Sequence, residues 1–351
     1  MAMHSRAKCV KVKKDKASQV LSILSKLNIR DVNLKVKHVD DYVLIPIKSE
    51  VNYQYIAEVL DNIDFSLCVN EFEEVTRYRS YKDLLKNRIP NQILHSLPRS
   101  FEIIGDIAII KLKDKAIIKY SNEIVKAIMS IAKNVRVVYA EEPGLEGEFR
   151  VKRLIHLGGE KRSWTIHKEY GIKIYVDIAK AYYNSSLAEE HRRIALMVRD
   201  GEVVADLFTG VGPFPLHITS LRNVIIYAVD KNVEAIKCLL KSITINKLKG
   251  RIVSIHADAN DFLNIIRDEI FDRVIMNLPH TSLAFLGKVL PKLRKGGYVH
   301  LYLIAHDEDE ALNKVSCTHS LKHYSYTVTY VGRVIDYSPH KYIYRVDIRR
   351  D

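Results

Sequence analysis

The residues best suited to chemistry begin in the stretch 203–216. A short apolar run ends there in Asp206, and Gly210 and Gly212 follow in a Gly-x-Gly turn. A buried strand that enters such a turn directs backbone N–H groups and a helix N-terminus toward a ligand. Glycine is required where a side chain would block the turn or the approach of the ligand. The stretch therefore predicts a small-molecule site at the end of this strand.

Three later apolar runs also end in polar residues, which are Asp230, Asp258 and Asn277. In a parallel sheet these ends share one edge, where ligands bind. Asp230 suits a ribose diol and Asp258 an exocyclic amine. Three acids would repel a pyrophosphate but attract a cationic sulfonium and its amino group, which favours S-adenosylmethionine over NAD. The third glycine of an NAD-binding motif is also replaced, by Pro215.

The fourth of these strand ends reads Asn277-Leu278-Pro279-His280. An asparagine followed by x-Pro presents a side-chain amide and main-chain carbonyls on a rigid turn, and these groups can pair with the edge of a nucleobase. Alone, such a tetrapeptide is more often an ordinary turn. At the end of this strand it predicts a base-binding site.

Strict alternation of strands and helices from residue 187 onward would position these residues. Ser186 and Glu189 form a capping-box pattern, which predicts a helix from Leu187 to near Gly201. The alternation predicts an α/β, Rossmann-like domain with a doubly wound, mostly parallel sheet and right-handed crossovers. The expected strands are 203–206, 224–230, 251–256, 271–276 and 297–304, with an antiparallel C-terminal hairpin at 324–331 and 341–347.

Two small α+β regions precede this domain. The first is expected to contain strands at 8–12, 32–37 and 41–47 and a helix at 15–27. The second is expected to contain helices at 81–88 and 123–132, strands around a Gly105-Asp106 turn, strands at 135–139 and 147–155, and a hairpin at 166–177. We therefore expect three domains, 1–75, 76–175 and 176–351.

Composition constrains the partners and the compartment. The chain has 351 residues, and 55 Lys and Arg against 42 Asp and Glu give a formal charge of +13, which suits a polyanion such as nucleic acid. No apolar run is long enough to span a membrane, and a signal peptide is not recognisable, so a cytoplasmic location is expected. The four cysteines are far apart without a C-x-x-C pair, so neither a disulfide framework nor a metal site is predicted.

Together these motifs resemble archaeal and eukaryotic tRNA (guanine-N1)-methyltransferases that act at position 37, beside the anticodon. The resemblance covers almost the whole chain. It is carried by residues 42–46, 101–108, 147–150, 165–171, 176–183 and 333–340.

The resemblance implies a class I methyltransferase that transfers a methyl group from S-adenosylmethionine to guanine N1. It implies that Glu190 is the general base, that Arg150 stabilises charge on guanine O6, and that Asn277 and Pro279 hold the target base. The implied cofactor site comprises Tyr182, Asp206, Phe208, Gly210, Gly212, Asp230, Asp258 and Asn277. The implied partner is tRNA, with the first domain on its outer corner and the other two on the anticodon arm, bound by a monomer.

The chain departs from the family around its acid. The family commonly reads Phe-Ser-Pro-Arg-Leu and then Glu-Arg, whereas this chain has Tyr-Asn-Ser-Ser-Leu at 183–187 and then Glu190-His191. The base pocket is accordingly assigned to Asn277, Leu278, Pro279, His280 and His191, with Glu189 as an alternative acid. The other functions that stay open are methylation at C7 of the tricyclic wyosine precursor, aminocarboxypropyl transfer in wyosine synthesis, and tRNA binding without catalysis.

Overall fold

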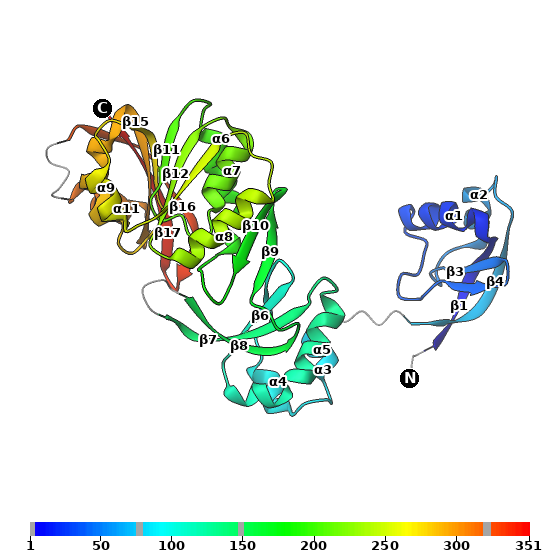
Figure 1. Ribbon diagram of the computed structural model, residues 1–351. Helices are drawn as coiled ribbons and strands as arrows, with labels where there is room; N and C mark the ends of the chain where they lie inside the picture. Colours follow the sequence, from blue (N-terminus) through cyan, green and yellow to red (C-terminus); the bar gives the residue numbers. More distant parts are fainter. Residues whose placement is uncertain (1–3, 75–79, 147–150, 319–323) are drawn as a thin grey trace. The chain divides into compact units, whose positions relative to one another are not determined.

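The computed structural model describes residues 4–74, 80–146, 151–318 and 324–351. The chain divides into two compact units, Met1–Arg79 and Ser80–Asp351 (Figure 1). Within the described residues, no helix is both long and apolar enough to cross a membrane.

The first unit is one four-stranded sheet, in the order β2-β3-β1-β4, packed against α1. Val20 and Leu24 of α1 are buried with Val10 and Ile45 of the sheet. The predicted strand at 32–37 was wrong, because Leu34 forms only an isolated bridge and strand pairing begins at Lys37. The elements are β1 His4–Lys13, α1 Lys14–Lys26, β2 Lys37–Val39, β3 Tyr42–Pro46, α2 Tyr53–Val59 and β4 Phe65–Glu73.

The first unit also corrects the cysteine prediction. Cys9 and Cys68 form a disulfide, with their Cα atoms 4.9 Å apart, where the sequence predicted separate thiols. The two residues are directly opposite each other in the antiparallel β1–β4 pair. The pairing could not be inferred because β4 had not been identified in the sequence. Cys238, in the second unit, is a buried thiol.

The second unit begins with a four-stranded sheet in the order β5-β6-β7-β8 and continues into the hairpin β9–β10. The predicted turn at Gly105-Asp106 and the hairpin at 166–177 are both confirmed. Ile124 and Ile128 of α5 pack on the sheet residues Ala108 and Ile110. The elements are α3 Tyr81–Leu85, α4 Asn91–Ser96, β5 Glu102–Ile104, β6 Ile107–Lys111, α5 Ser121–Ile131, β7 Val137–Glu146, β8 Val151–Gly159, β9 Trp164–Glu169 and β10 Ile172–Asp177.

A seven-stranded sheet in the order β13-β12-β11-β14-β15-β17-β16 forms the rest of the second unit. The strands β13, β12, β11, β14 and β15 are parallel, and β17 and β16 are antiparallel to their neighbours. The predicted doubly wound sheet with its antiparallel hairpin is confirmed. The strands are β11 Val203–Asp206, β12 Ile225–Asp230, β13 Arg251–His256, β14 Phe271–Met276, β15 Leu293–Ala305, β16 Tyr326–Ser338 and β17 Lys341–Arg350.

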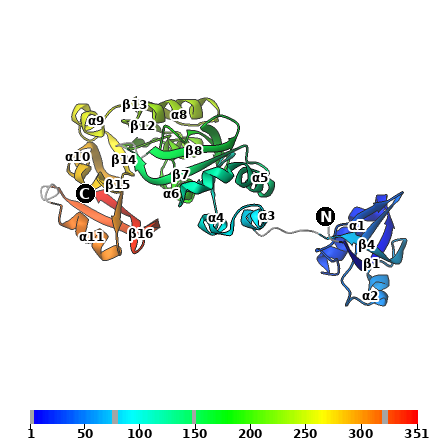
Figure 2. The same ribbon diagram turned by 90° about the horizontal axis from the view of Figure 1, so that it is seen from below.

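Helices cover both faces of this sheet, as parallel crossovers require. On one face, α6 and α7 share a buried cluster with the sheet, and α8 lies beside them. Figure 2 shows α9, α10 and α11 following one another beside β14 and β15, and their apolar residues bury the other face. The helices are α6 Ala188–Met197, α7 Pro213–Leu221, α8 Val233–Thr244, α9 Ala259–Ile265, α10 Leu286–Val289 and α11 Glu308–Ser316.

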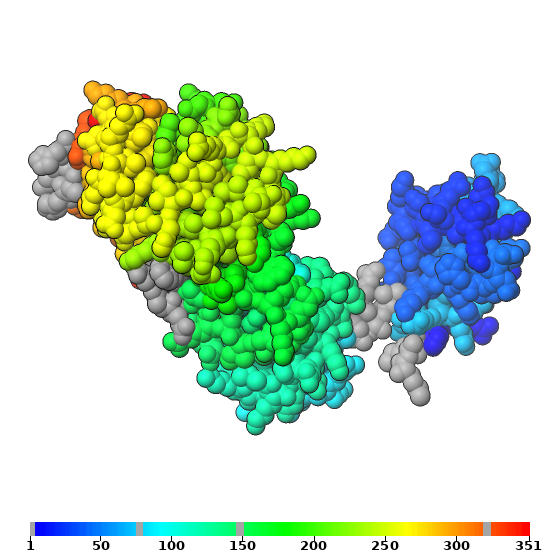
Figure 3. All heavy atoms as spheres, in the orientation of Figure 1, coloured from blue at the N-terminus to red at the C-terminus, as the bar shows by residue number. Residues whose placement is uncertain are grey.

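The hairpin β9–β10 joins the two sheets of the second unit. Ile174 and Val176 of β10 are buried in one cluster with Ile107 and Val137 of the smaller sheet and Leu239 of α8. In the space-filling view, green atoms of the central segment lie between the cyan atoms of the smaller sheet and the yellow-green atoms of the larger one (Figure 3). The hairpin is therefore packed against the smaller sheet and against α8 of the larger sheet.

The start of α6 differs from the prediction. No capping box forms between Ser186 and Glu189. Instead, the side chain of Asn184 accepts a hydrogen bond from the Ser186 N–H at the start of a 3₁₀ turn, Ser185–Leu187, and α6 begins at Ala188. Asn184 competes for the capping role because a short amide readily accepts from the backbone two residues on.

The glycine loop supplies a first testable prediction. Gly212 has φ +83° and its added Cβ would lie 2.2 Å from Cδ1 of the buried Leu239. Gly212→Ala is therefore expected to lower the free energy of unfolding by about 2–4 kcal/mol, through backbone strain and overpacking. Denaturant titration measures this loss. Gly296→Ala is the matched control, because Gly296 has φ +78° with no atom near its Cβ position. Equal losses in the two variants would contradict the packing role.

Candidate active site

The predicted polar residues do meet along one edge of the large sheet. Asp206 closes β11 beside Ala228 of β12 and Ile275 of β14, and the Leu207 N–H donates to the Ile275 carbonyl. Asp230 is the last residue of β12, and Asn277 follows the last residue of β14. The carboxyl ends of three parallel strands thus form one ligand-facing edge.

Asp206 is the most unusual acid of this edge. It is fully buried, and neither carboxylate oxygen makes a hydrogen bond of good geometry, although the Thr209 hydroxyl and the Phe208 N–H lie nearby. Burial raises its pKa to about 7, with a smaller contribution from the charge of Asp230. A buried carboxylate without partners is costly, so Asp206 is poised to accept a cationic N–H donor.

Asp230 is hydrogen-bonded to the backbone of two nearby segments. Its oxygens accept hydrogen bonds from the Gly210 N–H at 2.7 Å and from the Asn232 N–H at 2.8 Å, and burial raises its pKa. Gly210 has φ +56°, and the nearest atom to an added Cβ would be the Tyr182 carbonyl oxygen at 3.8 Å. The acid thus holds the loop in place, and the loop leaves space in front of it.

The remaining cofactor candidates, Asp258, Phe208 and Tyr182, differ in their partners and exposure. Asp258 caps α9 through the Asn260 N–H at 2.8 Å and lies 3.6 Å from Lys231, so local partners occupy its carboxylate. Phe208 packs edge-to-face on Phe285, with ring centroids 5.2 Å apart. Tyr182 is 42% exposed, so its ring is accessible to a ligand.

The tetrapeptide 277–280 forms a turn at the same edge. The Leu278 carbonyl accepts from the N–H groups of Thr281 and Ser282, and the Ser282 hydroxyl donates to the Tyr302 carbonyl. Asn277, Leu278 and Pro279 are half-buried, whereas His280 is exposed and packs edge-to-face on Tyr337. Asn277 thus lies directly after the last residue of β14.

Glu190, on α6, is hydrogen-bonded to side chains of two strands of the large sheet, β15 and β17. Its Oε1 accepts from the Tyr302 hydroxyl at 2.8 Å and from Arg345 Nη1 at 2.7 Å. Tyr302 and Arg345 are directly opposite each other on neighbouring strands. Burial raises the pKa of Tyr302 well above its usual value, so the phenol remains a donor. Two donors therefore orient the Glu190 carboxylate, while Oε2 lies 3.6 Å from Arg193.

A buried polar chain continues from Arg345 across three strands. Arg345 lies 3.0 Å from Asp347, which accepts from His300 Nδ1 at 2.6 Å. Burial lowers the pKa of His300, so Nε2 of the neutral ring accepts from Arg273 at 2.7 Å, and Arg273 pairs with Glu202 at 2.9 Å. This row of buried polar residues was not predicted from the sequence. The pattern that could have indicated it is the pair of charged residues, Arg345 and Asp347, which lie on one face of the otherwise apolar strand 342–348.

Two other residues were predicted from the sequence to take part in catalysis, Glu189 and Arg150. Glu189, the alternative acid, is exposed, whereas Glu190 is 4% exposed and joined to the buried chain. Arg150, which the resemblance implies at guanine O6, lies outside the described residues.

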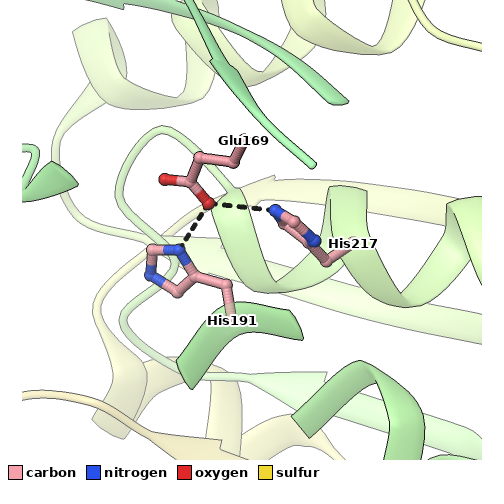
Figure 4. Close-up of side chains that lie close together, drawn as sticks. All are labelled: Glu169, His191 and His217. Carbon is pink, nitrogen blue, oxygen red and sulfur yellow. Dashed lines mark hydrogen bonds and ion pairs between the residues drawn. The ribbon is translucent and has the colours of Figure 1, made fainter. Parts of the chain in front are cut away.

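His191 is buried and contacts two other buried side chains. Its Nδ1 lies 2.9 Å from Glu169 Oε2, and His217 Nε2 lies 2.9 Å from the same oxygen (Figure 4). Burial opposes ionisation of Glu169, but hydrogen bonds from both imidazoles and from Tyr183 hold its pKa well below the usual range. Burial lowers the pKa of His191. Neither Glu169 nor His217 was singled out from the sequence.

Comparisons with known proteins identify the family of this chain. The TRM5/TYW2 methyltransferase domain matches residues 165–327, the TYW2 N-terminal domain residues 81–162, and the tRNA methyltransferase 5 N-terminal domain residues 9–55. The tRNA (guanine(37)-N(1))-methyltransferase Trm5b of Methanocaldococcus jannaschii is 33% identical, over 97% of this chain and 98% of its own length.

Two other proteins show the breadth of the relationship. The tRNA 4-demethylwyosine(37)-methyltransferase Taw21 of Saccharolobus solfataricus is 32% identical over 72% of this chain and 94% of its own length. The protein chain in the solved complex structure of aTrm5 and tRNALeu has 32% sequence identity to this chain. The two structures have a TM-score of 0.75, and the match covers 98% of this chain and 99% of that one. With its fold, its acid-lined sheet edge and its full-length similarity, this chain belongs to the TRM5/TYW2 family of tRNA methyltransferases.

Proposed function

We propose that this protein transfers a methyl group from S-adenosylmethionine to N1 of guanosine 37 in tRNA. The observation that carries the proposal is the placement of Glu190, which Tyr302 and Arg345 orient at the level of the turn that follows β14. A carboxylate fixed there can accept a proton from a base that Asn277 and Pro279 would hold. The family relationship supports the same reaction.

The acidic residues at the carboxyl ends of β11 and β12 are complementary in charge to the cationic S-adenosylmethionine. The unpartnered carboxylate of Asp206 suits the cationic amino group of the methionine part, and the ribose hydroxyls would meet Asp230. Tyr182 and Phe208 would line the adenosyl part. When bound, the cofactor supplies an electrophilic methyl group carried on a sulfonium.

The chemical difficulty lies in the substrate, because guanine N1 is a poor nucleophile until its proton leaves. We assign proton removal to Glu190, whose Oε2 is the oxygen turned away from Tyr302 and Arg345. The N1 lone pair then attacks the methyl carbon, the carbon–sulfur bond breaks, and the neutral thioether leaves. Arg150 is proposed to stabilise negative charge on O6 during this step.

Methyl transfer to unmodified tRNA transcripts tests the proposal. Transcripts with G or A at position 37 are incubated with labelled cofactor and digested to nucleosides. We expect N1-methylguanosine from the G37 transcript alone. No product from G37, or equal labelling of both transcripts, would refute the proposed base specificity.

Methylation at C7 of the tricyclic wyosine precursor at the same tRNA position is a second candidate. It is favoured by similarity to Taw21 and by the changed segment before the acid, where Asn184 caps a 3₁₀ turn and His191 is buried against Glu169. Methylation of tRNA that already carries the precursor would identify this activity.

We propose that each of the three expected domains binds a particular part of the tRNA. Residues 1–75 would contact the outer corner, and residues 76–175 and 176–351 would bind the anticodon arm. One chain would then supply both the tRNA-binding surface and the active site. We therefore propose a monomer, and a sedimentation coefficient that rises with protein concentration would contradict it.

A further inference from the structure

Glu169, His191 and His217 form a compact cluster that the proposed methyl transfer does not use. They come from three separate elements, the end of β9, the first turns of α6 and the middle of α7. Each is 2% exposed. Their ligand-type atoms, one carboxylate oxygen and two imidazole nitrogens, all lie within 4.8 Å of one another.

The side chains of the cluster are also oriented toward a common point. Both imidazoles direct a nitrogen at the same oxygen, Glu169 Oε2, each at 2.9 Å (Figure 4). The other oxygen, Oε1, accepts from the Tyr183 hydroxyl. A carboxylate held by an outer hydroxyl and flanked by two imidazoles is the arrangement in which metal ligands are oriented by a second layer of hydrogen bonds.

The charges of the cluster also point to a cation. The side chains that approach the Glu169 oxygens are two imidazoles and a phenol, rather than lysine or arginine. A carboxylate in the protein interior is costly unless a positive charge lies beside it. A divalent ion among the three ligands would compensate this charge.

We propose that Glu169, His191 and His217 bind a divalent transition-metal ion, with zinc as the expected ion. Two imidazoles and one carboxylate form an established zinc ligand set, and imidazole nitrogen selects transition metals over magnesium or calcium. With bonds of about 2.1 Å, tetrahedral ligand atoms lie about 3.4 Å apart. The two observed contacts of 2.9 Å would widen by about half an ångström, and the two imidazole nitrogens, which lie within 4.8 Å of each other, would also adjust toward this spacing.

The burial of the site assigns it a structural role. It fastens the β9–β10 hairpin to α6 and α7, and a site closed to solvent cannot admit a substrate. Because His191 follows Glu190 directly, the ion would also fix the first turns of α6, which carry the proposed catalytic acid. The sequence offered no metal motif, since the three ligands are 22 and 26 residues apart along the chain.

Metal content of the full-length protein tests this proposal independently of methyl transfer. The chelated and desalted protein is incubated with zinc chloride, desalted again and analysed by mass spectrometry. We expect stoichiometric zinc, a rise in Tm of several degrees, and visible d–d absorption when Co²⁺ replaces zinc. His217→Gln should lower the zinc content at least tenfold and abolish the cobalt spectrum.

The control variant is His95→Gln, at an exposed histidine of α4 that should leave zinc binding unchanged. Glu169→Gln provides a second variant, because it keeps the side-chain shape and removes the ligand charge. If the wild-type protein takes up only trace amounts of Zn²⁺, Co²⁺, Mn²⁺ and Fe²⁺ and its Tm does not change, the proposal is wrong. The cluster would then be an ion pair of Glu169 with a protonated imidazole.

Discussion

Glu190→Gln is expected to lower kcat for methyl transfer to G37 by about 10²–10⁴-fold, the usual contribution of a positioned general base. Glutamine keeps the length of the side chain and can still accept a hydrogen bond from Tyr302, but it cannot remove the N1 proton. The KM for tRNA should change little, because the acid lies within the protein and not on its surface. Single-turnover rates measured across pH provide the test. The variant's rate should rise with pH as solvent hydroxide replaces the missing base.

Two controls separate catalysis from folding in this experiment. Glu189→Gln changes the exposed neighbour and should retain full activity. Tyr302→Phe removes one of the two donors to Glu190 Oε1 and keeps the acid, so its loss of rate should be smaller. Because Glu190→Gln also removes one of the two carboxylates beside the buried Arg345, thermal unfolding of each variant is measured in parallel. A Glu190→Gln protein that folds and keeps most of its activity would exclude Glu190 as the base.

Asp206→Asn is expected to stabilise the cofactor-free protein and to weaken cofactor binding. Burial raises the pKa of Asp206 to about 7 from an unfolded value near 3.8. The folded state therefore keeps a proton that the unfolded state has lost, and the free energy of unfolding falls as pH rises from about 4 to 7. Three pKa units correspond to about 4 kcal/mol at pH 8, which the asparagine variant should largely recover.

The same carboxylate should bind the cofactor more tightly as it ionises. Cofactor affinity of the wild-type protein is therefore expected to increase as pH rises through 7, whereas Asp206→Asn should bind about 10–100-fold more weakly with no such pH dependence. Calorimetric titrations at pH 6 and 8 measure both effects, together with Tm. Asp261→Asn, at an exposed acid of α9, is the matched control. An unchanged affinity in Asp206→Asn would contradict the assigned role.

The sheet and its functional edge were accessible from sequence for a simple reason. Three of the parallel strands, β11, β12 and β14, are short apolar runs that end in a polar residue or are directly followed by one, so the pattern identifies the strand and its carboxyl end together. This pattern placed Asp206 and Asp230 at the ends of their strands and Asn277 directly after its strand, and their alignment follows from parallel pairing.

What the sequence did not reveal depends on contacts between distant segments. Arg345 holds Glu190 across 155 residues, and Cys9 meets Cys68 across 59. Local patterns contain no information about such partners. The capping box failed for a local reason, since Asn184 offered the chain a competing hydrogen bond two residues before Ser186.

The position of β17 has a consequence for the order in which the protein becomes active. β17 follows β16 in the chain but inserts between β15 and β16, and it carries the Arg345 that supports Glu190. Synthesis proceeds from the N-terminus, so the strands that form the cofactor edge leave the ribosome well before β17. A nascent chain that has not yet completed β17 therefore has Tyr302 but lacks Arg345, the second donor to Glu190 Oε1. The support of Glu190 is then completed only after the strands that end in Asp206 and Asp230 have been synthesised.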